Sequence, residues 1–473
     1  MLFTDPKFFL FAGVFFALYF LAPSRFRTAI TVAGSLVFYS VWDWRFVALL
    51  GFTILNGWFS ARAIANSDDP RRRKIVLVTF VTISLIILGW FKYFNFFAAS
   101  FANLMGGASW TTINIVLPVG ISFYTFHTMS YVIDVWRKKM EPEPRLLQFA
   151  EFVAIWPVLV AGPIIRASNL LPQLRRPRGF SWSNLVSGTE LIILGFFLKM
   201  VLADNLAPVV GAVYGSPNVF SSQANLIATL FFAFQIYGDF AGYSYIAIGF
   251  GRLLGVNFGS NFRRPYFSVD FSDFWRRWHI SLSSWLRDYL YIALGGNRHG
   301  VIRTYFNLTA TMVLGGLWHG ANWTFVVWGA LHGLYLIVQR LGTPAYRAVK
   351  KATRAPAFIL LPLRMIAVFA FVTLAWVFFR AGSVGDAWQV LGRIFAGSGQ
   401  RGGEVVRAYE LIRGFALIGA VVVVEAVLST PQGSRWRRLA FKRPVRWLAA
   451  AVMLLAIAAL GVTEGAQFIY FAF

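Results

Sequence analysis

The sequence predicts an all-α polytopic membrane protein, and three observations lead to that prediction. Of the 473 residues, 58% are hydrophobic and 18% are aromatic, and the mean hydropathy is +0.62, which is far from the composition of a soluble domain. Apolar stretches follow one another along the chain, many of them long enough to cross a hydrocarbon core of about 30 Å. Short basic loops separate these stretches. We therefore expect about 11–13 transmembrane helices in a single membrane-embedded domain over residues 1–473.

The predicted spans are placed in chain order by their apolar composition. Residues 7–22 form the first span, a retained helix rather than a signal peptide, because Thr4, Asp5 and Pro6 do not make a basic leader. The other predicted spans cover residues 28–41, 45–61, 75–98, 112–136, 186–212, 224–250, 304–318, 322–340, 358–379, 411–428 and 445–462.

The charge of the chain is +25, from 44 Lys and Arg against 19 Asp and Glu. In a soluble protein this excess would suggest a nucleic-acid partner, but here the cations gather in short loops, which the positive-inside rule places in the cytoplasm. The basic loops lie at residues 71–74, 137–139, 175–178, 347–354 and 435–446, whereas the uncharged loops at 101–112 and 215–223 are placed outside. Some of the cations could also attract an anionic substrate, such as the phosphates of coenzyme A.

Several classes of protein are disfavoured by what the sequence lacks. There is no cysteine, which excludes disulfides, thiolate metal sites and catalytic thiols. No Walker A sequence and no Gly-x-Ser-x-Gly elbow is present, so ATP-driven transport and that type of hydrolase lose support. The five histidines do not have the spacing of a metal site, and we expect neither a metal nor a bound cofactor.

Two segments do not have the pattern of a single transmembrane helix. Residues 149–166 are apolar but have basic loops on both sides, and they contain the helix breakers Pro157, Gly162 and Pro163. We predict a re-entrant segment there, which a membrane protein tolerates only where the backbone is packed in protein or lines a cavity. Residues 273–290 alternate apolar and polar positions at helical spacing and predict one amphipathic interfacial helix, with Ser272 as its N-cap.

His319 is the strongest candidate for chemistry. It lies in a run without Asp, Glu, Lys or Arg from Thr304 to Gln339, which is 36 residues long. A continuous helix of that length would measure about 54 Å, longer than the hydrocarbon core, so we predict a break at the glycines beside His319. An imidazole at that depth is neutral, because burial disfavours the cation, and neutral imidazole is a competent general base. The alternative is a hydrogen-bonded core histidine.

The other four histidines are weaker candidates. His279 lies on the predicted amphipathic segment and could point inward, although packing among tryptophans explains it equally well. We expect core packing for His332 and a structural role for His127, which lies among aromatic residues. His299 follows a glycine-rich loop and is expected to be exposed.

Asp239 places a carboxylate inside a predicted span and needs a partner or a proton. It could orient an imidazole or pair with a cytoplasmic arginine, and the alternative is a structural contact between two helices. Lys199 and Asp204 lie at a helix end, but their offset of five residues is a poor spacing for an α-helical pair, so we expect the lysine to snorkel.

Six stretches in the middle of the chain carry distinctive motifs: residues 118–126 (PVGISFYTF), 161–163 (AGP), 237–244 (YGDFAGYS), 273–283 (DFWRRWHISLS), 285–291 (WLRDYLY) and 315–320 (GGLWHG). Through these stretches the sequence resembles the membrane-bound O-acyltransferase family, and within it the members that acetylate alginate or transfer D-alanine to teichoic acid. The stretches occur in the family's order and cover most of residues 115–340. Two positions depart from the family's usual pattern: Tyr245 stands where Asp is usual, and Ala472 where Gln is common.

The resemblance implies a fold of many helices around a central funnel or tunnel. It assigns the catalytic histidine of a Trp-His-Gly motif to His319 and the second histidine, of a Trp-His-x-Ser motif, to His279. It also implies a periplasmic partner protein. The residues that we expect to contact substrate are Trp318, Asn322, Asp239, Arg276, Arg277, Arg287 and Arg298, the arginines being suited to phosphate groups.

We therefore expect an enzyme of the bacterial inner membrane that moves an acyl group from a cytoplasmic thioester toward an extracytoplasmic polysaccharide such as alginate. Acetyl from acetyl-CoA is the expected donor group. The alternatives within this class are D-alanyl transfer from a carrier-protein thioester to teichoic acid, and acetyl transfer to peptidoglycan. From other classes, a polysaccharide or small-molecule transporter and a structural scaffold remain open, but neither gives a reason for the two histidine motifs.

Overall fold

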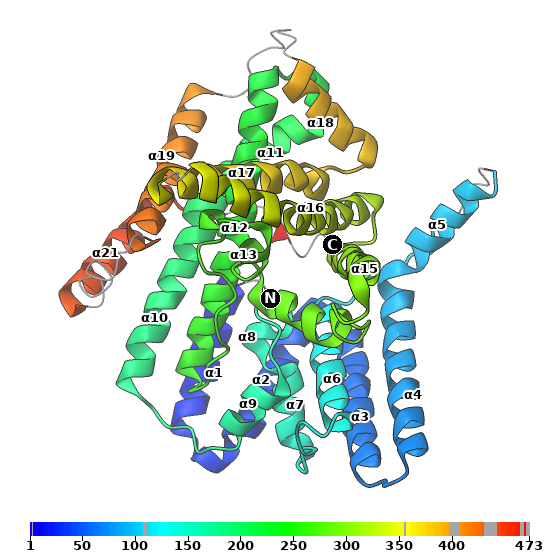
Figure 1. Cartoon of the computed structure of the whole chain (residues 1–473). Helices are drawn as coiled ribbons and strands as arrows, with labels where there is room; N and C mark the ends of the chain where they lie inside the picture. The colour runs from blue at the N-terminus through cyan, green and yellow to red at the C-terminus, as the bar shows by residue number, and fades with distance from the viewer. Residues whose placement is uncertain are drawn as a thin grey trace. The chain divides into compact units, whose positions relative to one another are not determined.

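The computed structural model describes residues 1, 3–106, 112–353, 356–396, 407–429, 442–463 and 468–469. Over these residues the regular structure is helical and no strand is present (Figure 1). The chain forms two compact units. Unit 1 comprises Met1–Ile192 and Tyr243–Gly259, and unit 2 comprises Ile193–Gly242 and Ser260–Phe473. The expectation of a single membrane domain over residues 1–473 stays a prediction.

The helices have the following bounds. In the first part of the chain they are α1 Pro6–Leu21, η1 Ser24–Phe26, α2 Arg27–Asp43, α3 Arg45–Ala65, α4 Pro70–Leu88, the π-helix η2 Gly89–Tyr93, α5 Phe94–Leu104, α6 Ile121–Trp136, α7 Leu146–Ala154, α8 Trp156–Leu159, α9 Ala167–Leu174 and α10 Trp182–Phe196. They continue as the π-helix η3 Phe197–Ala203, α11 Asp204–Gly215, η4 Pro217–Val219, α12 Ser222–Leu253, η5 Pro265–Phe267, α13 Phe271–Trp275, α14 Ile280–Trp285, the π-helix η6 Leu286–Tyr291, α15 Gly300–His319, α16 Trp323–Thr353, α17 Ala357–Arg380, α18 Val384–Ala396, α19 Ala408–Ser429 and α21 Arg443–Leu460.

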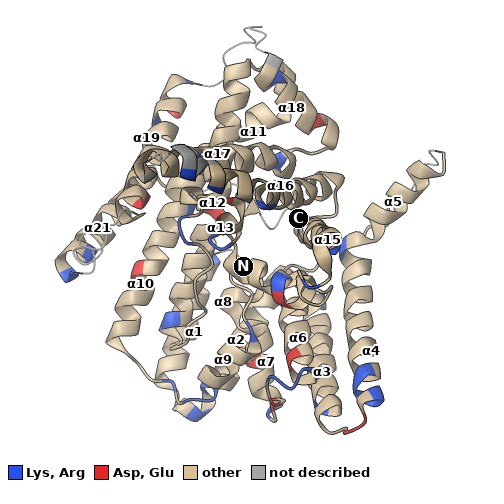
Figure 2. Cartoon of the chain, viewed as in Figure 1, with Lys and Arg blue, Asp and Glu red and all other residues tan. Residues whose placement is uncertain are grey.

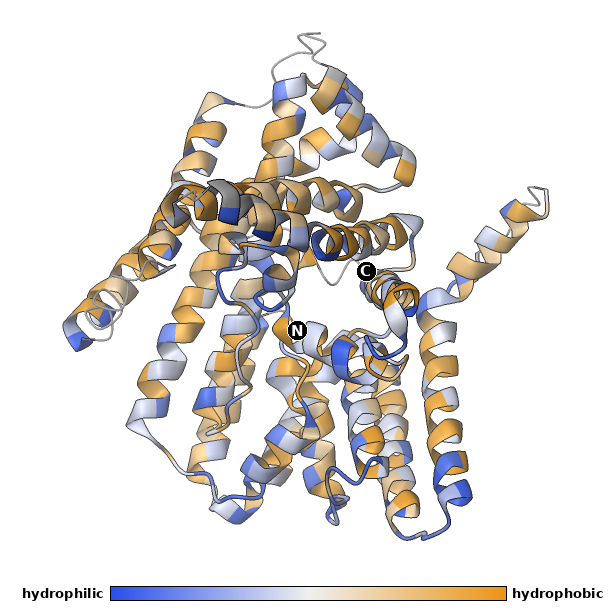
Figure 3. Ribbon diagram, in the orientation of Figure 1, coloured by the Kyte–Doolittle hydropathy of each residue, from blue (hydrophilic) through white to orange (hydrophobic). Residues whose placement is uncertain are grey.

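The prediction of an all-α polytopic membrane protein is confirmed. Among the described residues, eight helical stretches are long and apolar enough to cross a membrane, and α1 is a shorter apolar helix. Hydrophobic residues run along the length of these helices (Figure 3). The total of about 11–13 spans stays a prediction. One predicted span, residues 112–136, becomes helical only from Ile121, because Gly120 before it takes the left-handed backbone angle φ of 78°.

Basic residues gather at one end of the helices of unit 1. The start of α4, the loop between α6 and α7, and the loop between α9 and α10 all lie at the lower end of this unit in the view of Figure 2, where Lys and Arg are blue. These segments contain three of the basic clusters that the sequence assigns to the cytoplasm. Their common location is the arrangement that the positive-inside rule predicts.

The segment at residues 149–166 is broken and buried, as predicted. Helix α7 ends at Ala154, the four-residue α8 follows, and Gly162 then takes φ of 111°. Trp156, at the start of α8, has no exposed surface and packs against rings of α1, α2 and α12, including Phe8 and Phe250. The segment is therefore part of the core of unit 1, and its re-entrant depth in a membrane stays a prediction.

The charge-free run breaks where the sequence predicts. Helix α15 ends at His319, Gly320 is extended, and α16 begins at Trp323. Two glycines let α15 and α16 pack backbone against backbone: a Cβ atom on Gly316 would lie 2.1 Å from the carbonyl oxygen of Phe325, and one on Gly329 would lie 2.4 Å from that of Met312. This close packing fixes the end of α15, and with it the position of His319.

The prediction of one amphipathic helix over residues 273–290 is wrong. The segment contains α13, a turn, the short α14 and the π-helix η6. The break falls at His279, whose backbone is left-handed with φ of 41° and ψ of 54°. Ser272 is not the N-cap either: α13 begins earlier, and the side chain of Asp270 accepts a hydrogen bond from the backbone N–H of Asp273 at 2.7 Å.

Candidate active site

The last turn of α15 places His319 in an aromatic enclosure of unit 2. The side chain is 3% exposed. Its ring centroid lies 5.1 Å from that of Trp318, 5.2 Å from Trp328 on α16 and 5.3 Å from Phe379 on α17. Each of these rings meets the imidazole edge-on. Three helices therefore hold His319 in a water-poor site, where electrostatic interactions with a reacting group are strong.

His279 lies beside His319, so the structure brings together the two histidines that sequence analysis singled out. The two ring centroids are 6.2 Å apart, and the ring of Trp318 lies 5.8 Å from that of His279. Phe240 of α12 packs edge-on against His279 at 4.6 Å. We refer to His279 and His319 as the imidazole pair. They are 40 positions apart in the sequence, and each lies at a helix terminus.

The environment of His279 determines its charge. The side chain has no exposed surface, and burial lowers its pKa to about 3. The imidazole is therefore neutral near pH 7, the form that accepts a proton or a hydrogen bond. The left-handed backbone at His279 costs on the order of 1–3 kcal/mol for a residue with a Cβ atom, and such strain is concentrated at functional sites.

Asp239 forms an ion pair with Lys199, and within the described part of the chain it pairs with no imidazole or arginine. The ammonium of Lys199 lies 2.8 Å from Asp239 Oδ1 and also 2.8 Å from Asp204 Oδ1, so one cation bridges two buried carboxylates. The second oxygen of Asp239 accepts a hydrogen bond from the backbone N–H of Ile469 at 2.8 Å. Lys199, Asp204 and Asp239 are called the ion triad below.

The expectation that Lys199 snorkels away from Asp204 is wrong, and the reason is local geometry. Residues 197–203 form a π-helix, η3, in which residues five apart along the chain become neighbours on one face. The offset of five that is unfavourable in an α-helix is therefore the favourable spacing here. Gly242 lets α12 pack closely against this stretch, because a Cβ atom at that position would lie 2.7 Å from the carbonyl oxygen of Gly195 and 3.1 Å from the backbone nitrogen of Lys199.

The arginines expected to contact substrate lie on the surface of unit 2. Arg277 pairs with Asp273 at 3.0 Å, and Arg276 lies 3.8 Å from the same carboxylate. Arg287 pairs with its neighbour Asp288 at 2.7 Å. The side chains of Arg276 and Arg287 are 69% and 63% exposed, and Arg298 is also exposed. They can meet a soluble anion, but each paired cation is partly neutralised by its carboxylate.

Two other residues were expected to contact substrate. Trp318 lies in the aromatic enclosure of the imidazole pair, whereas the side-chain amide of Asn322 is already hydrogen-bonded within the protein. Asn322 caps α16: its Oδ1 accepts a hydrogen bond from the N–H of Thr324 at 3.0 Å, and its Nδ2 donates to the carbonyl of Gly382 at 2.9 Å. The geometry gives Asn322 a structural task at the start of the helix that follows His319. A substrate contact of Asn322 stays a prediction.

The remaining histidines have the surroundings that the sequence predicts. His127 Nε2 accepts a hydrogen bond from the N–H of Ile165 at 3.0 Å, which ties α6 to the broken segment of unit 1. His332 is fully buried among aromatic rings, with Trp328 at 4.8 Å and Trp275 at 5.0 Å. His299 is exposed. Core packing for His332 and a structural role for His127 are therefore confirmed.

Sequence analysis missed Asn261, a polar residue that contacts the imidazole pair. Asn261 follows α12 in a stretch without regular structure, and its side chain lies 3.2 Å from Nδ1 of His279. Asparagine in a loop usually signals only a turn, so nothing in the local pattern distinguishes it. The departure at Tyr245 lies in unit 1, and Ala472 lies outside the described residues.

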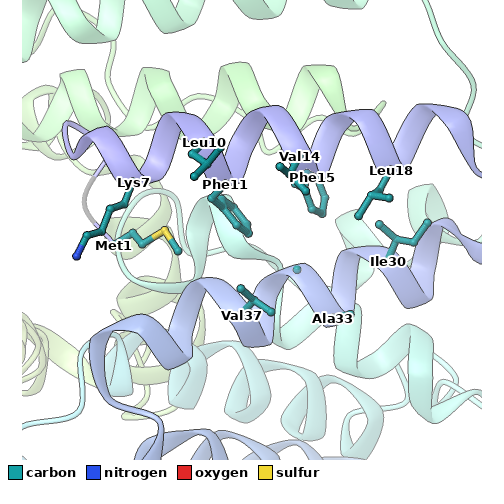
Figure 4. A pocket seen from close by; sticks show the side chains of 11 residues that line it. Met1, Lys7, Leu10, Phe11, Val14, Phe15, Leu18, Ile30, Ala33 and Val37 are labelled. Carbon is teal, nitrogen blue, oxygen red and sulfur yellow. The ribbon is translucent and has the colours of Figure 1, made fainter.

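An apolar groove of about 500 Å³ lies between α1 and α2 in unit 1 (Figure 4). It is lined by Met1, Lys7, Leu10, Phe11, Val14, Phe15, Leu18, Ile30, Ala33, Gly34 and Val37. Apart from Lys7 and the amine of Met1 this lining is apolar, and it contains no histidine, carboxylate or hydroxyl group. The groove is therefore an apolar surface feature of unit 1.

The known proteins that this chain resembles all transfer acyl groups. The profile of the membrane-bound O-acyltransferase family matches residues 140–379, which include both histidines. A probable alginate O-acetylase of Azotobacter vinelandii is 41% identical over 401 residues, covering 84% of this chain and 78% of the relative. A peptidoglycan O-acetyltransferase of Helicobacter pylori is 34% identical, covering 83% and 79%. A teichoic acid D-alanyltransferase of Streptococcus thermophilus is 28% identical, covering 57% and 69%.

Proposed function

Because this chain belongs to the membrane-bound O-acyltransferase family and is a multi-pass membrane O-acyltransferase, we propose that it transfers acetyl from acetyl-CoA toward an extracytoplasmic polysaccharide. The single observation that carries the proposal is the imidazole pair, in which two buried histidines lie with ring centroids 6.2 Å apart. Acetyl is favoured over D-alanyl because this chain is 41% identical to a probable alginate O-acetylase and 28% identical to a D-alanyltransferase.

The proposed reaction needs a base, a stabilised oxyanion and a leaving group. His319 takes the proton of the acceptor hydroxyl as that oxygen attacks the thioester carbonyl carbon. The tetrahedral oxyanion is stabilised by N–H donors, for which the Trp318 indole and the backbone N–H of Gly320, the first residue after α15, are candidates, because the N–H groups of residues 315–319 bond within the helix. The intermediate then collapses, the C–S bond breaks and the thiolate of coenzyme A leaves. The proton held by His319 passes to that thiolate, so no other co-reactant is needed.

The surroundings of His319 support its role as base. Aromatic rings enclose the imidazole on three sides, which excludes water that would hydrolyse the thioester. The exposed Arg276, Arg287 and Arg298 are the proposed contacts for the phosphates of the donor. Acetyl-CoA is cytoplasmic, so these arginines belong on the cytoplasmic side of the inner membrane in this proposal, consistent with the positive-inside rule.

The acceptor and the partner are part of the same proposal. The name of the relative from Azotobacter points to alginate, and that from Helicobacter to peptidoglycan. Both are polysaccharide acceptors outside the cytoplasm, so the acetyl group must cross the membrane. We propose that a periplasmic transferase is the partner. Either a hydroxyl of that transferase or the sugar itself accepts the acetyl group first.

The test is release of thiol from acetyl-CoA by the purified protein in detergent or nanodiscs. Wild type is compared with His319→Ala, and His299→Gln is the matched control because His299 is an exposed histidine. We expect the His319 variant to lose activity by about 100-fold or more and the His299 variant to retain it. Chromatographic homogeneity shows that each variant is folded.

Two results would contradict the proposal. Equal thiol release by wild type and His319→Ala would remove His319 from the reaction. If the wild type released no thiol from acetyl-CoA but did so from a D-alanyl carrier thioester, the proposed donor would be wrong and the proposed site would stand. If the protein were a transporter, the folded His319→Ala variant would still transport its substrate.

A further inference from the structure

One residue, Asn261, contacts the His279 segment at four points. Its backbone carbonyl accepts a hydrogen bond from the N–H of Ile280 at 2.9 Å. Its side-chain Oδ1 lies 3.2 Å from the backbone nitrogen of Ser281, 2.8 Å from the hydroxyl of Ser281 and 3.2 Å from Nδ1 of His279. Asn261 is 1% exposed. A single loop asparagine therefore holds both the strained backbone at His279 and the imidazole ring.

These contacts determine which atom of the asparagine amide faces the histidine. A backbone N–H only donates, so the atom that receives it from Ser281 must be the amide oxygen. An oxygen of this kind only accepts. Nδ1 of His279, 3.2 Å from the same oxygen, must therefore carry the hydrogen. The assignment follows from hydrogen-bond chemistry and does not depend on placing any hydrogen atom on the ring.

The tautomer of His279 follows directly. A neutral imidazole has one N–H, and if Nδ1 carries it, Nε2 carries the lone pair. Nε2 then accepts a hydrogen bond or a proton and donates neither while the ring is neutral. Nδ1 is directed at Asn261, so Nε2 lies on the opposite edge of the ring. The neighbouring titratable group is His319, with its ring centroid at 6.2 Å.

We propose that Asn261 is a positioning residue that fixes His279 in the Nδ1–H tautomer, so that Nε2 of His279 acts as an acceptor in the acyl transfer. The inference rests on the proposed function. In this arrangement His279 does not donate a hydrogen bond to the oxyanion. That donor must be the Trp318 indole N–H or a backbone N–H group. His279 instead accepts a hydrogen bond from a hydroxyl or amide N–H of a substrate and orients it toward His319.

The physical basis is the same as for other oriented imidazoles. A partner that accepts from one ring nitrogen fixes both the tautomer and the direction of the second nitrogen. Loss of that partner lets the ring rotate or change tautomer, and a misplacement of about 1 Å in a reacting group costs on the order of 100-fold in rate. The hydroxyl of Ser281 also lies 3.4 Å from Nδ1 of His279, but it donates its one hydrogen to Asn261 Oδ1 at 2.8 Å, so toward Nδ1 it can only accept.

The test combines a spectroscopic signature with activity. Protein labelled with ¹⁵N in its histidine rings is studied by solid-state NMR in lipid, and the His279 signals are assigned by their loss in His279→Gln. We expect a protonated Nδ1 and an unprotonated Nε2 for the wild type. Asn261→Leu, which has a similar size and no acceptor, should lose that pattern and about 100-fold in thiol release. Asn261→Asp, which keeps an acceptor oxygen, should retain the pattern and most of the activity.

Ser281→Ala is the matched control, because it removes the hydroxyl, which lies 2.8 Å from Asn261 Oδ1 and 3.4 Å from Nδ1, but leaves the shorter contact between Asn261 Oδ1 and Nδ1 at 3.2 Å. We expect nearly normal activity from it. A wild-type His279 protonated at Nε2 would overturn the inference, as would full activity of Asn261→Leu. The NMR measurement uses no substrate, so it decides the tautomer even if the wild type fails to release thiol from acetyl-CoA. Failure of the proposed function is thereby distinguished from failure of this inference.

Discussion

Replacement of Lys199 by methionine tests the ion triad most directly. The ammonium of Lys199 lies 2.8 Å from a carboxylate oxygen of Asp204 and 2.8 Å from one of Asp239, and all three side chains are at most 10% exposed. Lys199→Met leaves two buried carboxylates without their shared cation. Breaking a buried ion pair in this way costs about 3–5 kcal/mol. With the usual entropy of unfolding of about 2.1 cal/mol/K per residue, a unit of about 260 residues, the size of unit 2, shifts its midpoint of thermal unfolding by about 5–9 °C.

The control follows from the same electrostatics. The variant Lys199→Met/Asp204→Asn/Asp239→Asn removes every charge of the ion triad, and well-packed neutral replacements are often as stable as a buried ion pair. We therefore expect the triple variant to recover much of the loss. Fluorescence-monitored unfolding in detergent measures both variants at one scan rate. An unchanged midpoint for Lys199→Met, or a triple variant less stable than the single one, would refute the argument.

The same variants report on activity. Asp239 precedes Phe240, which packs edge-on against His279 with 4.6 Å between ring centroids. Asp239 also accepts a hydrogen bond from Ile469 near the end of the chain. Loss of Lys199 should therefore disturb the packing around His279 and lower thiol release as well as stability. We expect activity to return in parallel with the midpoint in the triple variant, because the triad acts through position and not through chemistry.

Two further predictions follow from close packing and from charge. Gly316→Ala places a Cβ atom 2.1 Å from the carbonyl oxygen of Phe325, so we expect about 1–3 kcal/mol of destabilisation and a loss of thiol release, whereas Gly342→Ala on the same helical hairpin meets nothing within 4 Å and should be neutral. Arg287→Gln removes an exposed cation paired with Asp288, so we expect a raised KM for acetyl-CoA at an unchanged kcat, with a smaller effect at high salt. An unchanged KM at low salt would remove this arginine from donor binding.

The sequence predicted the parts of the fold that depend on composition and on local breakers. The break after His319 was predictable because a charge-free run of 36 residues is too long for one crossing and contains glycines. The break in residues 149–166 was predictable from Pro157 and Gly162. In both cases the cause lies within a few residues of the effect.

The features that the sequence did not predict depend on backbone that departs from the regular helix. The apolar spacing over residues 273–290 is that of an α-helix, and it does not reveal that His279 takes a left-handed backbone. The five-residue offset of Lys199 and Asp204 becomes a contact only in a π-helix. Asn261 meets His279 only through the folding of the loop after α12. Periodicity assumes regular geometry, so it fails where a site requires an exception.

These exceptions share a physical logic. His279 in a left-handed backbone and the π-helix at Lys199 each cost free energy relative to a regular helix, and each is compensated by polar contacts that a regular helix would not permit. Asn261 compensates the first with four contacts to one short segment, and the carboxylates of the ion triad compensate the second. In a membrane protein such buried polar groups are expensive unless fully paired, which makes each arrangement close to all-or-none. Single substitutions at Asn261 or Lys199 should therefore affect the imidazole pair more than their distance from the reacting atoms would suggest.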